Sequence, residues 1–127
     1  MENRITLRPV DGDVPVDEVR GYLQSRSDVL LDPLGSGIFI ITGNEEANDF
    51  FEWKRRENPE DFPFAGLITV FPEGIGVLQE FADDEMLRTA REIVEWVLQR
   101  RTYTLSNEYG HDLTPVYLSK GLDPLFS

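Results

Sequence analysis

His111 is the only histidine in the chain, and histidine is the usual general base near neutral pH. A serine hydrolase would pair it with Ser106 or Ser119 as the nucleophile and with Asp112 as the group that orients the imidazole. Neither serine lies in the strand–turn–helix elbow that presents such a nucleophile, and Asp112 is only the next residue in the sequence. We therefore interpret His111 as a histidine beside a surface turn and expect no catalytic residues here.

Clustered carboxylates near the N-terminus suggest calcium, which binds oxygen ligands. They are Asp11, Asp13, Asp17 and Glu18. An EF-hand loop that starts at Asp11 needs glycine at its sixth position and glutamate at its twelfth, where this chain has Val16 and Tyr22. The sequence therefore predicts a turn followed by the acidic start of a helix, without a metal site. Pairs of carboxylates, as glycosidases use them, carry little information among 24 acids.

Phosphate and nucleic acid are poor ligand candidates. Gly35-Ser36-Gly37 lacks the lysine of a phosphate-binding loop and precedes a β-rich run instead of a helix. Lys54-Arg55-Arg56 is the only basic triplet, and acids flank it at Glu52 and Glu57. The 24 acids and 12 bases give a net charge of -12, which repels nucleic acid and anionic membranes and attracts cationic partners.

The acidic excess is densest in residues 45–61, where aromatic residues accompany the acids. Carboxylates that steer a partner and aromatics that anchor it suit an interface with a basic protein. The other interpretation of this segment is a solvated helix face with its aromatics tucked into the core. The predicted partner-binding residues are Glu45, Glu46, Asp49, Glu52, Trp53, Glu57, Glu60, Asp61 and Phe62.

Three function classes follow. We favour a small, acidic, non-catalytic binding protein that covers a basic protein partner, either as an immunity or antitoxin-like protein or as a nucleic-acid mimic. The second class is a small-molecule-binding or enzymatic domain whose pocket is lined by Tyr103, Tyr109, His111 and Tyr117. The third is a self-associating regulatory subunit, a homodimer for example, with Trp96 or Leu125-Phe126 in its interface. No cofactor is expected.

The elements that must position these residues can be predicted from periodicity. Alternating residues predict a strand at 4–9, placed near a sheet edge because Pro9 has no N–H to donate. Hairpins are expected at 29–41 and at 67–81, the second around a three-residue Pro72-Glu73-Gly74 loop with Gly74 left-handed. Helices are expected from Pro15, from Asn44 and from Asp83, with a last strand near Tyr103 and a helical turn from Thr114 to Gly121.

The resulting order is β-α-β-β-α-β-β-α-β. It favours an α+β fold, loosely ferredoxin-like, with a mostly antiparallel sheet and helices on one face. We expect one compact domain over residues 1–127, in which residues 107–127 form a C-terminal turn and docking tail. The absence of cysteine, of a signal-like N-terminal stretch and of a long apolar run favours a cytoplasmic protein.

Overall fold

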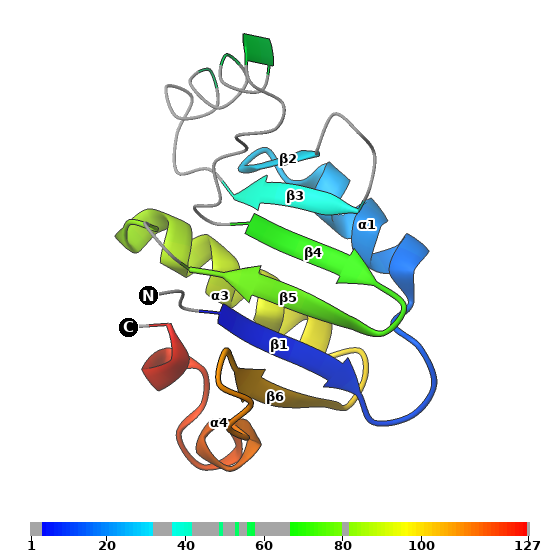
Figure 1. Cartoon of the computed structure of the whole chain (residues 1–127), viewed down its shortest axis with the longest axis vertical. Coiled ribbons are helices and arrows are strands. Elements are labelled where there is room, and N and C mark those ends of the chain that lie inside the picture. Colours follow the sequence, from blue (N-terminus) through cyan, green and yellow to red (C-terminus); the bar gives the residue numbers. More distant parts are fainter. Residues whose placement is uncertain are drawn as a thin grey trace.

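The computed structural model describes residues 4–31, 37–41, 49, 53, 56–57, 67–79 and 82–126. In this part of the chain the fold is α+β, with a six-stranded antiparallel sheet in the order β2-β3-β4-β5-β1-β6 (Figure 1). The strands are β1 (Arg4–Pro9), β2 (Val29–Leu31), β3 (Ile38–Ile41), β4 (Leu67–Phe71), β5 (Gly74–Leu78) and β6 (Tyr103–Asn107). The helices are α1 (Val16–Ser25), α3 (Asp84–Leu98), α4 (Thr114–Lys120) and the 3-10 turn η1 (Asp123–Leu125). The predicted α+β class and antiparallel sheet are confirmed, whereas the ferredoxin-like strand order is not.

Strand β1 lies between β5 and β6, next to the edge strand, so it is near an edge as predicted but is paired on both sides. Pro9 is tolerated because it is the last residue of β1, where it lies opposite Tyr103. The next residue, Val10, resumes the pairing by donating its N–H to the carbonyl of Thr102 at 3.0 Å. One missing donor at the end of a strand therefore does not interrupt the ladder.

Helices α1 and α3 pack against the same face of the sheet, as predicted, and lie behind it in Figure 1. In α3 the buried positions recur at helical spacing and form one apolar stripe, namely Met86, Ala90, Ile93, Val94 and Val97. These side chains belong to a single core with alternate residues of five strands, such as Ile5 and Leu7. Asp83 caps the helix, because its Oδ1 accepts a hydrogen bond from the N–H of Met86 at 2.8 Å.

The β4–β5 hairpin has a shorter loop than predicted. Phe71 pairs with Gly74, which leaves only Pro72 and Glu73 in the turn. Gly74 belongs to β5 and is not among the described glycines with positive φ. Glycine is needed there for space, since a Cβ atom at Gly74 would lie 2.8 Å from the carbonyl oxygen of Leu7 on β1.

The C-terminal segment docks on the main core. Leu122 and Phe126 are buried there, and the side-chain amide of Gln79 donates to the carbonyl of Leu125 at 3.2 Å. The helix predicted from Asn44 falls mostly outside the described residues, although Asp49, Trp53, Arg56 and Glu57 are helical. No helix in the described part of the chain has the length and apolarity needed to cross a membrane.

Candidate functional site

Three of the predicted partner-binding residues are described, and all three are exposed. They are Asp49, Trp53 and Glu57, with Trp53 56% exposed. Helical residues four apart share one side of a helix and are about 6 Å apart along its axis. We call these three exposed helical residues, which are four apart in the sequence, the stripe. The remaining predicted residues lie outside the described part: Glu45, Glu46, Glu52, Glu60, Asp61 and Phe62.

This stripe has the chemistry of a site for cations. The face of an indole ring attracts an ammonium or guanidinium group, and a flanking carboxylate can pair with the same cation. Tryptophan is also enriched among the residues that contribute most to protein interfaces. Arg56 is exposed as well and lies next to Glu57, so the surroundings of the stripe are not uniformly acidic.

The predicted Tyr/His residues are not brought together in one pocket. Tyr103 is buried in the core, where burial raises the pKa of its phenol, and Tyr117 packs half-buried against that core. Tyr109 and His111 lie on the surface, with ring centroids 6.1 Å apart. Asn107 arranges this turn, because its Oδ1 accepts hydrogen bonds from the N–H groups of both ring-bearing residues. None of the surface hollows described below is lined by these four residues.

Asp112 lies two residues before the first residue of α4 and binds that residue. Its Oδ1 accepts the N–H of Thr114 at 3.0 Å, and hydrogen bonding to Thr114 holds the pKa of Asp112 below its usual range. Trp96 stacks on Tyr22, Phe126 is 7% exposed and Leu125 packs half-buried against the core. The residues of both predicted self-association surfaces thus have contacts within the chain.

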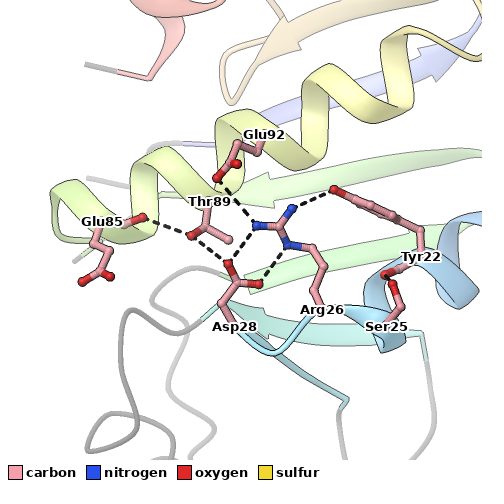
Figure 2. A network of polar contacts seen from close by, with 7 residues as sticks. All are labelled: Tyr22, Ser25, Arg26, Asp28, Glu85, Thr89 and Glu92. Carbon is pink, nitrogen blue, oxygen red and sulfur yellow. Dashed lines mark hydrogen bonds and ion pairs between the residues drawn. The ribbon is translucent and has the colours of Figure 1, made fainter.

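A polar network that the sequence analysis missed joins the end of α1 to α3 (Figure 2). The Nε and Nη2 atoms of Arg26 donate to the two oxygens of Asp28, both at 2.8 Å. Its Nη1 atom donates to the hydroxyl of Tyr22 at 2.8 Å, and Nη2 lies 3.6 Å from the carboxylate of Glu92 on α3. The hydroxyl of Thr89 lies 3.2 Å from Asp28 and 3.1 Å from the carbonyl of Glu85.

Stacked rings continue this network along the two helices. Tyr22 and Trp96 lie parallel with ring centroids 4.0 Å apart, and the guanidinium carbon of Arg100 is 3.9 Å from the Trp96 ring centroid. Arg100 also pairs with Glu18 at 3.3 Å. The spacing of Tyr22 and Arg26 places them on one side of the α1 end, but nothing local in the sequence indicated that α3 would lie beside them.

The network can hold the two helices together, but it is poorly suited to acid–base catalysis. The hydrogen bonds from Arg26 lower the pKa of Asp28, and those contacts in turn raise the pKa of Arg26. A general base works best with a pKa near the working pH, and both shifts move away from it. We therefore assign the network a structural role.

The described surface has shallow hollows, among them the following three. One, of about 230 Å³, lies between α3 and the C-terminal segment, where Arg91 pairs with Asp123 at 2.9 Å. Another, of about 260 Å³, lies beside Val10 and Thr102. The largest, of about 280 Å³, lies on the sheet face opposite α1 and α3. Among the described residues, no group of three acidic or histidine side chains could hold a metal ion.

No family model matches the sequence, and no curated protein or solved structure matches the chain. Inference about its function therefore starts from the exposed residues themselves.

Proposed function

We propose that the protein is an acidic binding module that covers the cationic site of a basic protein partner. The observation that supports it best is the exposed stripe of Asp49, Trp53 and Glu57. Two versions fit this chemistry: an immunity or antitoxin-like inhibitor of a nucleic-acid-binding toxin, and a mimic of nucleic acid whose carboxylates replace phosphates. The cytoplasm is the location we propose, since a chain without cysteine gains nothing from an oxidising compartment.

Charge and aromatic area would have separate tasks in such a complex. The net charge of -12 accelerates encounter with a basic partner over a range of about 10 Å at moderate salt. The indole of Trp53 would then bury apolar surface and receive a lysine or arginine of the partner. Charge changes at the rim should thus alter the association rate, whereas loss of the anchor should alter the dissociation rate.

A native-lysate pull-down at low and at high salt would identify the partner, and kinetics with the purified partner would then test the stripe. We expect D49K/E57K to slow association, by about tenfold at low salt, with a smaller effect on dissociation. Trp53→Ala should accelerate dissociation and leave association nearly unchanged. Measurements at several salt concentrations should give a steep loss of affinity as salt rises.

The matched control is D17K/E95K, which changes the net charge equally at two exposed acids of α1 and α3. If this control slowed association as much as D49K/E57K does, only the overall charge would matter and the stripe would not be the site. A partner that bound all three variants like the unmodified chain would contradict the proposal.

A further inference from the structure

The largest of the three hollows lies on the β1, β4 and β5 strands. It is on the face of the sheet opposite α1 and α3, which lie behind the sheet in Figure 1. Its floor comes from alternate residues of three neighbouring strands, because successive side chains of a strand point to opposite faces. On β1 these are the residues that alternate with buried Ile5 and Leu7. The lining consists of Arg4, Thr6, Arg8, Thr69, Phe71, Glu73, Gly74 and Gly76.

Three polar side chains face this hollow without using their hydrogen-bonding capacity inside the described part of the chain. The guanidinium of Arg8 has no ion pair or hydrogen bond there, and the hydroxyls of Thr6 and Thr69 have none either. Arg8 is exposed and the two threonines are half-buried. A guanidinium and two hydroxyls together form a set of donors suited to a carboxylate.

Two glycines lie among these donors, at Gly74 and Gly76. Gly76 lies opposite Thr69 on β4 and opposite Thr6 on β1. The cross-strand row Thr69–Gly76–Thr6 therefore lacks a side chain at its middle position. Thr69 leans over that gap, since a Cβ atom at Gly76 would lie 2.7 Å from its Oγ1. Gly74 separates Phe71 from the stem of Arg8, whose Cγ atom would lie 3.5 Å from an added Cβ. Neighbouring atoms thus approach both glycines closely, and the hollow is bordered there by the Thr69 hydroxyl and the stem of Arg8.

We propose that this hollow, defined by Thr6, Arg8, Thr69, Phe71 and Gly76, binds a small aromatic monocarboxylate. Arg8 and the threonine hydroxyls hold the carboxylate, and the ring lies against Phe71, which is 40% exposed. The volume of about 280 Å³ falls just below the range of about 300–1,000 Å³ typical of drug-sized ligands, which suits a single ring.

Charge selects a monoanion among anionic ligands. The lining contains two arginines and Glu73, and the carboxylate of Glu108 accepts the N–H of Arg4 at 3.2 Å, so the hollow offers little positive charge beyond the guanidinium of Arg8. The rest of the molecule is strongly negative, and each further negative charge on a ligand would be repelled by that field. A phosphate dianion or a nucleic acid is therefore disfavoured at the same place.

The experiment is an NMR titration of the full chain with benzoate, followed through its backbone amides. We expect saturable shifts centred on Thr6, Arg8, Thr69 and Gly76. Benzyl alcohol and inorganic phosphate, added at equal ionic strength, should bind at least about tenfold more weakly, since each lacks the ring or the charged acceptor. Binding of phosphate as strong as that of benzoate would overturn the assignment to an aromatic carboxylate.

Two variants locate the site, and their own spectra report whether they fold. Arg8→Gln should weaken benzoate binding by at least about tenfold, because it removes a charge-assisted hydrogen bond. The control is Arg88→Gln, since Arg88 is exposed on α3, on the other side of the sheet. This variant makes the same change in net charge and should leave the affinity for benzoate unchanged. Equal effects of the two variants, or shifts that do not saturate, would overturn the proposal.

Discussion

Asp28 accepts hydrogen bonds from Arg26, and these contacts favour its charged form and lower its pKa. In the unfolded chain an aspartate titrates at about 3.9. A carboxyl whose pKa is lower in the folded state adds stability above the unfolded value, and this stability disappears as the pH falls through the folded value. The Arg26–Asp28 pair therefore stabilises the link between α1 and α3 at neutral pH and loses that effect in acid.

Asp28→Asn tests this linkage. We expect the free energy of unfolding at neutral pH to fall by about 1–2 kcal/mol, because a charge-assisted pair becomes a weaker one at a site still partly open to water. The difference from the unmodified chain should shrink as the pH drops below about 4. Urea unfolding at a series of pH values measures both quantities.

Glu95→Gln serves as the control for that substitution, since Glu95 is exposed on α3. It should change stability by only a few tenths of a kcal/mol at every pH. A destabilisation by Asp28→Asn that stayed constant from neutral to acid pH would contradict the role of the ion pair, because it would arise from packing alone.

Among the elements, β6 shows how the sheet protects its edge. The N–H of Leu105 donates to Oγ1 of Thr114 at 2.9 Å, and its carbonyl accepts the N–H of Leu113 at 2.7 Å. The N–H of Asn107 donates to the carbonyl of His111 at 3.0 Å. The chain thus folds back over its own edge strand, where unpaired groups would invite pairing with another molecule.

Thr114→Val should expose this edge while keeping the size of the side chain. The N–H of Leu105 would lose its acceptor, so we expect a stability loss of about 1 kcal/mol and faster exchange of that amide with solvent. Thr104→Val, on the exposed side of the same strand, is the control and should leave the Leu105 amide protected. Hydrogen exchange followed by NMR gives both results, and unchanged protection in Thr114→Val would contradict the capping role.

The elements that could be predicted from sequence are those specified by local signals. Asp83 and the apolar stripe of α3 mark that helix, and short apolar runs next to turn residues mark β3 to β5. The pairing of β1 on both sides could not be predicted, because it depends on β5 and β6 rather than on anything near Pro9. The turn at Pro72 was predicted one residue too long, since the space needed at Gly74 is set by Leu7, far away in the sequence.

The candidate surfaces, too, could be predicted only where local signals in the sequence specify them. The Asp49–Trp53–Glu57 stripe could be predicted in part, because helical spacing is a local property. The sheet-face hollow could not, since Arg8, Thr69 and Gly76 come from three strands whose register is visible only in the sheet. The network of Arg26 likewise needed two helices that are distant in sequence.

At the scale of the whole molecule, the net charge of -12 predicts how stability depends on salt. Like charges repel one another more in the compact state, and added salt screens that repulsion. The described ion pairs of Arg91 and Arg100 are on the surface and would each lose little on screening. We therefore expect Tm to rise when KCl is increased from about 0.02 M to about 0.2 M, as scanning calorimetry can measure. A fall in Tm would show that attractive pairs outweigh the repulsion.

The interior position of β1 also bears on the order in which the sheet can assemble. Ile5 pairs with Val77 on one side and with Asn107 on the other, so the first of the six strands meets its neighbours only after most of the chain has followed it. Pairings between such distant residues close large loops and slow the folding of small domains. During synthesis, the β2–β5 meander can form before β1 has paired on both sides. Strand β6 pairs only with β1, so it can join the sheet only once the chain beyond Asn107 has emerged from the ribosome.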